Sequence, residues 1–296
     1  MIHANPFLIR ASLGEIITIK GLGDVHFLRK DSDHDKFISD LKTRTTPQTF
    51  FIDLGDSLDA IGPGHKYFSV DQIRPEFFIT KDSRGRLESA SKPLLDAEVD
   101  GLCNTIAKHT QPEEWIGHIS GNHPLFLLNN GLDLTQQLCA RLNHRYLGYQ
   151  AYVPINIQTK GDEKFSLMIL ASHGFGGAGQ RWEGAGLNSY IQHAMRYDSW
   201  DVAMYGHRHD KWVKALARIR PYINHHTGER WVKDEIKLIC QTGTYLRSLS
   251  NSLWPSYSEK KGMSPRPLGC ISIQFKINRV RDKSRDRNLK IEYLNI

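Results

Sequence analysis

Cysteine is scarce in this sequence, and no two cysteines form a Cys-x-x-Cys pair. Each of the four lies among apolar residues, which predicts buried free thiols in a reducing cytosol rather than disulfides. No apolar run approaches the roughly 18 residues of a membrane span, and residues 1–13 lack the pattern of a signal peptide. We therefore expect a cytoplasmic protein without a membrane partner. The cysteines are Cys103, Cys139, Cys240 and Cys270.

The sequence also lacks the nucleotide-binding loop that ends in Gly-Lys-Ser/Thr. Residues 175–186 are rich in glycine but have no such ending, so they predict a mobile loop beside His173 rather than a phosphate cradle. There is no internal repeat. With 296 residues, ordinary hydrophobic content and alternating strand and helix patterns, the chain fits one α/β domain spanning 1–296.

Acidic residues are fewer than basic ones, and the formal net charge is +7. Residues 276–290 hold seven basic and two acidic side chains, inside a predicted C-terminal β-hairpin at about 268–296. Such a patch could attract a phosphate backbone, or it could be an ordinary solvated hairpin tip. An insertion at about 60–92 mixes aromatic and basic residues, as does the loop 247–267. Both could stack nucleotide bases or simply pack on the domain.

Polar clusters follow several apolar strands. The buried strand Val202–Tyr205 is followed by Gly206, and then by His207 and His209, whose i, i+2 spacing turns both imidazoles to one side if the chain stays extended. Similar clusters follow the strands 15–20, 49–54, 115–120 and 165–171. Because ligand sites lie beyond the carboxyl ends of strands in α/β sheets, we expect these clusters to meet at one sheet edge as a metal site. They are Asp24 and His26, Asp56, Asn122 and His123, His173, and His207 and His209.

The ordered motifs Asp-x-His, Gly-Asp-x-x-Asp, Gly-Asn-His, His-Gly and Gly-His-x-His resemble those of the calcineurin-like metallophosphoesterase superfamily. The resemblance spans residues 16–245. It implies an α/β fold with a central β-sandwich flanked by helices in α/β/β/α layers. It also implies two metal ions at the carboxyl ends of the strands.

The resemblance assigns a role to each motif residue. Asp24, His26 and His209 correspond to ligands of the first metal, and Asn122, His173 and His207 to ligands of the second. Asp56 corresponds to the bridging carboxylate. His123 corresponds to the histidine that contacts the substrate phosphate and helps the leaving group depart, and Asp59 to a supporting position. The family usually has an acidic residue after Gly-Asn-His, whereas this chain has Pro124.

Histidine, asparagine and carboxylate ligands favour Mn²⁺, with Fe, Zn²⁺ or Ni²⁺ as alternatives. Two such ions can generate a bridging hydroxide that attacks phosphorus, so the predicted activity is a hydrolase acting on phosphoesters. We expect a phosphodiesterase acting on nucleotides or single-stranded nucleic acid, with Arg181 and Arg208 as candidate phosphate contacts. A phosphomonoesterase, acting on proteins or small molecules, is the alternative. A nucleic-acid-binding protein without turnover is a third hypothesis, which the complete ligand set disfavours.

Overall fold

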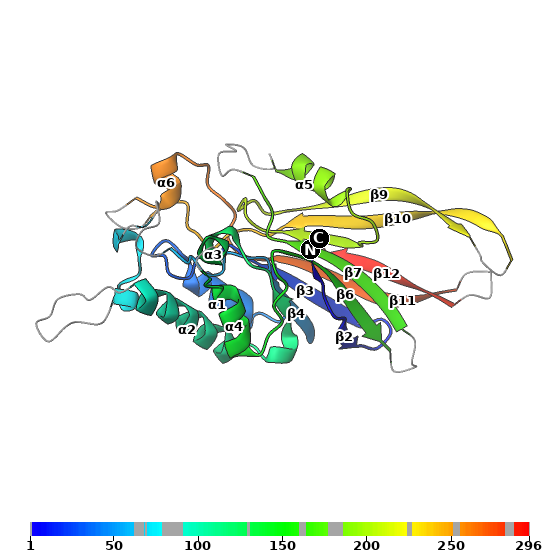
Figure 1. Ribbon diagram of the computed structural model, residues 1–296. Helices are drawn as coiled ribbons and strands as arrows, with labels where there is room; N and C mark the ends of the chain where they lie inside the picture. Colours follow the sequence, from blue (N-terminus) through cyan, green and yellow to red (C-terminus); the bar gives the residue numbers. More distant parts are fainter. Residues whose placement is uncertain are drawn as a thin grey trace, which may run out of the picture.

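The computed structural model describes residues 2–61, 68, 70–78, 91–128, 131–159, 164–176, 186–223, 227–250, 255–281 and 287–295. Its strands form two mixed sheets, and helices lie outside them (Figure 1). The chain is therefore α/β, as the alternation of patterns in the sequence predicts.

The first sheet has the strand order β12-β11-β3-β4-β5. Strands β3, β4 and β5 are parallel, and β11 is antiparallel to both of its neighbours. The predicted strand-helix-strand rhythm is confirmed here, because a helix follows β3 and another precedes β5. The strands are β3 (Ile16–Leu22), β4 (Gln48–Asp53), β5 (Trp115–His118), β11 (Ile271–Arg281) and β12 (Arg287–Asn295).

The second sheet has the order β1-β6-β7-β8-β10-β9, and β2 also pairs with β6. This sheet is mixed, since hairpins add antiparallel pairs between β6 and β7 and between β9 and β10. Strand β9 was not predicted. The strands are β1 (Ile2–His3), β2 (Phe7–Arg10), β6 (Gln150–Gln158), β7 (Lys164–Ser172), β8 (Val202–Tyr205), β9 (Trp212–Ile223) and β10 (Arg230–Gln241).

The main core lies between the two sheets. Buried side chains of the first sheet, such as Ile17 and Ile52, belong to one hydrophobic cluster with Val153 and Met204 of the second. Fully burying one such side chain contributes about 1.5–3 kcal/mol, so this interface stabilises the face-to-face packing strongly.

Helices cover the outer face of each sheet. Leu95, Val99 and Leu102 of α2 share a cluster with Phe51 of β4, and Tyr190 of α5 packs with β8 on the other side of the molecule. The layers therefore run helix, sheet, sheet, helix (Figure 1). The helices are α1 (His34–Lys42), α2 (Ser91–His109), α3 (Asn122–Leu128), α4 (Leu134–Leu142), α5 (Leu187–Ala194) and α6 (Tyr257–Lys261), with 3-10 turns η1 (Val70–Gln72), η2 (Pro75–Phe78) and η3 (Pro112–Glu114).

Two predicted peripheral segments are only partly described. Within the insertion, Phe68 and Phe77 pack against a small cluster of Leu28, Ile73 and Leu94, which agrees with a packing role for these two aromatic residues. The other aromatic and basic positions of residues 62–86 lie mostly outside the described residues, as does the hairpin tip 282–286.

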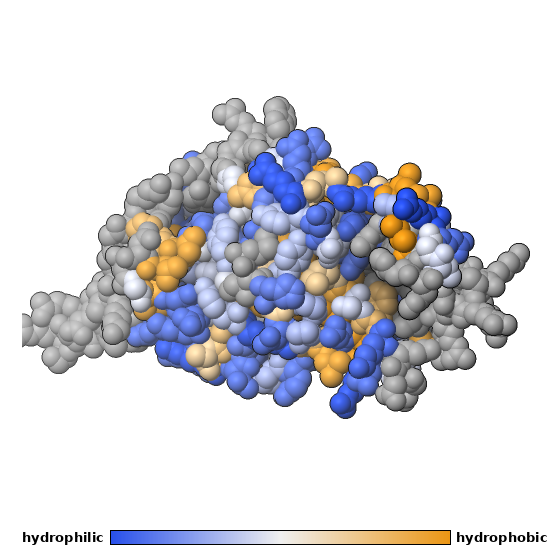
Figure 2. All heavy atoms as spheres, turned by 45° about the vertical axis from the view of Figure 1, so that its right-hand side comes forward, coloured by the Kyte–Doolittle hydropathy of each residue, from blue (hydrophilic) through white to orange (hydrophobic). Residues whose placement is uncertain are grey.

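All four cysteines are buried free thiols, as predicted. None of the helices in the described ranges combines the length and apolar character that a bilayer span requires. In the view of Figure 2, hydrophilic residues dominate and hydrophobic residues occur in separate patches.

Candidate metal centre

The predicted cluster residues all follow carboxyl ends of strands, but these strands come from both sheets. Asp24, Asp56 and Asn122 follow β3, β4 and β5, whereas His173 follows β7 and His207 follows β8. The expectation of a single sheet edge is therefore wrong. Because the sheets pack face to face with these strand ends on the same side, the loops of both meet over their shared edge.

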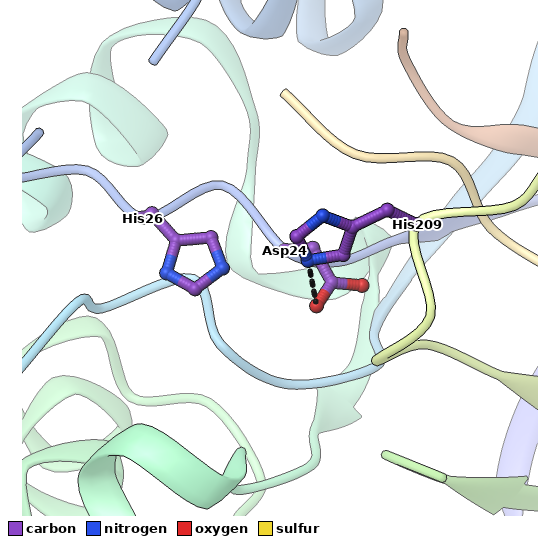
Figure 3. A group of neighbouring side chains, drawn as sticks. All are labelled: Asp24, His26 and His209. Carbon is purple, nitrogen blue, oxygen red and sulfur yellow. Dashed lines mark ion pairs between the residues drawn. The ribbon is translucent and has the colours of Figure 1, made fainter. Parts of the chain in front are cut away.

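Asp24, His26 and His209 form the first cluster, with ligand atoms within 4.8 Å of one another. Figure 3 shows the His209 ring directed at the Asp24 carboxylate, where Nε2 lies 3.3 Å from Oδ1. Asp24 is fully buried, and His26 is buried beside it. This trio contains the three residues that the resemblance assigns to one metal.

Asp56, His173 and His207 form the second cluster, also within 4.8 Å. Nε2 of His173 lies 3.2 Å from Oδ2 of Asp56, 3.3 Å from Nδ1 of His207 and 2.9 Å from Oδ1 of Asn122. Since His173 donates from Nδ1 to the carbonyl of Leu54, its Nε2 is left as the atom facing the cluster. The structure thus brings together the four residues assigned to the second metal and the bridge.

One buried atom in particular shows that these residues fit a cation. Nε2 of His26 is buried and makes no hydrogen bond, and beside it Oδ1 of Asp24 has the 3.3 Å contact with His209 but no hydrogen bond that meets the usual geometry. Buried polar atoms are normally satisfied, and an imidazole nitrogen beside a carboxylate oxygen is a donor set for a transition metal. The other nitrogen of His26 is engaged, because Nδ1 lies 2.9 Å from Oδ1 of Asp59.

Backbone strain is concentrated at this site. The chain has left-handed φ values at Asp24, His26, Asp56, His207 and His209, of 52°, 49°, 51°, 77° and 62°. A non-glycine residue in this region costs on the order of 1–3 kcal/mol, and such strain persists where surrounding contacts impose it. Hydrogen bonds from Asp24 N to Gly55 O (2.8 Å) and from His207 N to Asp24 Oδ2 (2.9 Å) provide such contacts.

The same strain corrects one prediction. An extended chain would turn His207 and His209 to one side, but both residues have positive φ. The backbone therefore twists, so that His207 joins the second cluster and His209 the first. This split is the one that the family resemblance implies.

His123 lies beside the first and second clusters and is a member of neither. It stands in the first turn of α3, directly after Asn122, and not in an extended segment. One helical step of about 100° separates the two side chains instead. The next residue, Pro124, fits because the first helical turn needs no backbone N–H at that position.

Asp59 connects His123 to the first cluster. His123 donates from Nδ1 to the backbone carbonyl of Asp59 (2.9 Å), and the same nitrogen lies 3.4 Å from the Asp59 carboxylate. That carboxylate also contacts Nδ1 of His26. Although burial opposes it, hydrogen bonding to His123 and His26 holds the pKa of Asp59 well below its usual range. The predicted supporting residue therefore orients two histidines at once.

The charge on His123 follows from its neighbours. Burial lowers its pKa, but the Asp56 and Asp59 carboxylates outweigh this effect and raise the pKa to about 10. In the metal-free protein His123 is therefore protonated at neutral pH, with Nε2 lying 4.0 Å from Oδ2 of Asp56.

This shift predicts a pH dependence of stability in chelator-treated protein. Because the folded pKa of about 10 exceeds the unfolded value of about 6.5, the contribution of His123 is complete below pH 6.5 and is lost as the pH rises toward 10. Urea unfolding between those pH values should show this decline. Although burial opposes it, the Asp56 charge raises the pKa of His173 to about 9, so His173 adds to the decline in the same range. His123→Gln should therefore make the decline less steep without removing it, and an equally steep decline in the variant would contradict the assignment.

A pocket of about 210 Å³ opens over both clusters. Besides the cluster residues it is lined by Arg29 and Arg208, and by Ile61, Leu246 and Met263. Arg208, a predicted candidate, is held by the carbonyl of Phe175 at 3.0 Å and lies over the Tyr190 ring. Arg181, the other candidate, lies outside the described residues.

Sequence reasoning missed two residues of this region. Arg29 is buried at the pocket wall, three positions after His26, within a polar run that gives no distinct signal. Glu98 is fully buried in α2, where burial and then the nearby Asp59 charge raise its pKa to about 8. A signal for Glu98 was present, because it falls at helical spacing among Leu94, Leu95 and Leu102 on the apolar face.

Gly121 provides a test of how tightly the site is packed. A Cβ at this position would collide with both the carboxylate and the backbone nitrogen of Asp56. We expect Gly121→Ala to lower the free energy of unfolding by about 1–3 kcal/mol and to weaken metal binding, because Asp56 must move. Gly14→Ala is the control for metal binding: its site is open but its φ is +80°, so alanine should cost stability through backbone strain and leave metal affinity unchanged. Calorimetric metal titration and urea unfolding measure both effects, and unchanged metal affinity in Gly121→Ala would contradict the prediction.

No family model and no curated protein matches this chain. Among solved structures it is similar to one described as "GAP50 the anchor in the inner membrane complex of Plasmodium", with 9% sequence identity and a TM-score of 0.45. The match covers 95% of this chain and 89% of that chain. A likeness this weak carries no information about function, so the function is inferred from the geometry of the site.

Proposed function

We propose that this chain is a metal-dependent phosphoester hydrolase of the calcineurin-like metallophosphoesterase type. The observation that carries the proposal is the pair of adjacent clusters, with Asp56 in the second. His123 lies beside Asp56 and groups with His26 and Asp59. The two face-to-face sheets between helices support the same proposal, since the family has a central sandwich of this kind.

The chain's residues would hold two divalent ions. Asp24, His26 and His209 would bind one, His173, His207 and Asn122 the other, and Asp56 both. Mn²⁺ suits this mixed set, with Fe, Zn²⁺ or Ni²⁺ as alternatives. When bound, such a pair supplies Lewis-acid chemistry, lowering the pKa of water and neutralising charge on phosphate oxygens.

His123 would act on the leaving group. Its Nδ1 is held by Asp59, which leaves Nε2 to face the pocket and to donate a proton to the departing oxygen. Arg208 adds positive charge to the pocket wall, where a phosphate would be bound, and Arg29 lines the same wall in an ion pair with Asp31.

The proposed substrate is a phosphodiester in a nucleotide or a short single-stranded nucleic acid. A pocket of about 210 Å³ suits one phosphate and a flanking group better than a long duplex. One observation favours the alternative of a phosphomonoester: Arg208 lines the pocket beside the clusters, and its positive charge matches a dianionic terminal phosphate.

Hydrolysis of bis-p-nitrophenyl phosphate and of p-nitrophenyl phosphate, with Mn²⁺ or with chelator, tests the proposal. Metal-dependent turnover of the diester with little turnover of the monoester supports a phosphodiesterase. Turnover of the monoester alone supports the phosphatase and overturns the diester assignment. If neither compound is hydrolysed, nucleotides and short oligonucleotides are assayed next, and their resistance would overturn the hydrolase proposal.

A further inference from the structure

Glu98 is a buried carboxylate that the chemistry of the site has not used. It projects from the middle of α2 and is fully buried. Its two oxygens accept hydrogen bonds from the backbone N–H groups of Asp59 at 2.5 Å and Ala60 at 3.1 Å. The backbone N–H of Leu28 donates to it as well.

These three donors belong to two different loops. Leu28 follows His26 in the loop after β3, and Asp59 lies in the loop after β4. The Glu98 carboxylate therefore ties together the loop that carries Asp24 and His26 and the loop that carries Asp56. Ala60 has a left-handed φ of 53°, so the backbone held by Glu98 is itself strained.

Asp59 connects Glu98 to two histidines of the site. Its backbone N–H is fixed by Glu98, its carbonyl accepts from His123, and its carboxylate contacts His26. A displacement of Asp59 would therefore move one candidate metal ligand and the candidate proton donor together. His173 and His207 of the second cluster make none of these contacts; His173 is oriented instead by the Leu54 carbonyl and His207 by the Asp24 carboxylate.

We propose that Glu98 is a positioning residue, which sets the first metal site and His123 through the backbone of Asp59. This inference rests on the proposed function for its metal and catalytic consequences, but the positioning itself concerns the metal-free chain. Its signature is unequal, because Glu98 acts on the first site through Asp59 and His26 and on the second site only through the loop that carries Asp56.

The test is Glu98→Gln, compared with Glu114→Gln. The amide keeps the shape of the side chain but replaces one acceptor oxygen with a donor group, which faces backbone N–H groups. Glu114 is the matched control, because its carboxylate also accepts a backbone N–H, from Gln111 at 2.7 Å, far along the chain from the site loops. Outer residues that orient ligands typically change metal affinity by about 10- to 100-fold.

In stepwise Mn²⁺ titrations, we expect Glu98→Gln to weaken binding at the first site about 10- to 100-fold and to weaken binding at the second site much less, because Asp56 alone of the second cluster lies in a loop that Glu98 holds. His209→Ala and His207→Ala identify the two steps. Equal weakening of both steps, or a lower melting temperature with unchanged affinities, would mean a merely structural role and overturn the proposal. If Glu98→Gln does not fold, Glu98→Asp is tested in its place. We expect it to weaken Mn²⁺ binding at the first site most, and unchanged Mn²⁺ affinity there would contradict the proposal.

A second readout needs neither metal nor activity. In metal-free protein, histidine-selective ¹H–¹⁵N spectra should show protected Nδ1–H signals of His26 and His123, which Glu98→Gln shifts or broadens and Glu114→Gln does not. Unchanged signals would overturn the positioning role. Wild-type protein that binds no metal would instead refute the proposed function, while this spectroscopic result would still stand.

Discussion

Asp56→Asn is expected to abolish metal-dependent hydrolysis, with kcat/KM falling at least about 10³-fold. The Asp56 carboxylate accepts from the backbone of His123 at 3.0 Å and lies 3.2 Å from Nε2 of His173. Asparagine keeps the volume and tolerates the left-handed φ at this position, but it removes the charge between the two candidate metals. This fall in kcat/KM corresponds to a loss of several kcal/mol of transition-state stabilisation, since each tenfold change in rate is about 1.36 kcal/mol.

Metal-free stability separates this loss from misfolding. In chelator, Asp56→Asn should lose the stability that the Asp56 charge gives through His123 and His173 and still unfold cooperatively in urea. It should also lack the further stabilisation that Mn²⁺ gives the wild type. Asp133→Asn is the matched control, because Asp133 caps α4 and asparagine caps helices equally well. Retained nucleic-acid affinity in Asp56→Asn, together with wild-type turnover, would contradict the hydrolytic account.

His123→Gln is expected to lower kcat by about 10²–10⁴-fold while both metal ions still bind. Its side chain is held by Asp59 and lies 4.0 Å from the Asp56 carboxylate, so it is close to the clusters without being assigned as a ligand. Glutamine can still donate to the Asp59 carbonyl, but it cannot transfer a proton to a leaving group.

The leaving group makes this prediction sharper. A p-nitrophenolate leaves without being protonated, whereas an alkoxide needs a proton to leave. The loss of kcat in His123→Gln should therefore be much greater for alkyl phosphoesters. His109→Gln, at the carboxyl end of α2, should leave both rates unchanged. Equal losses with both leaving groups would assign His123 to phosphate binding instead of proton transfer.

Much of the site could be predicted because its candidate ligands directly follow the ends of strands in the sequence. Apolar runs such as Val202–Tyr205 identify buried strands, and the polar residues that follow them in the sequence are the ones that meet in space. The helices α1 and α2 follow equally well from their apolar periodicity. Local pattern is sufficient wherever local packing decides the structure.

The rest depends on contacts that a local pattern does not carry. The sequence around His207 and His209 does not predict the left-handed backbone that separates their side chains. A hydrogen bond from His207 N to Asp24, which follows a strand of the other sheet, helps to impose that conformation. Strand β9 was missed because its exposed residues, such as Ile219, do not alternate clearly with polar ones. Glu98 was missed: its place on the apolar face of α2 marks it as unusual, but its partners Asp59 and Ala60 lie in a loop about 40 positions away in the sequence.

Crystals of the wild-type protein soaked in Mn²⁺ test the central claim most directly, through anomalous scattering at the manganese edge. We predict two peaks per chain, one among Asp24, His26 and His209 and one beside His173 and His207, with Asp56 touching both. Their absence, or a single peak that Asp56 does not touch, would contradict the dinuclear centre and with it the proposed hydrolase.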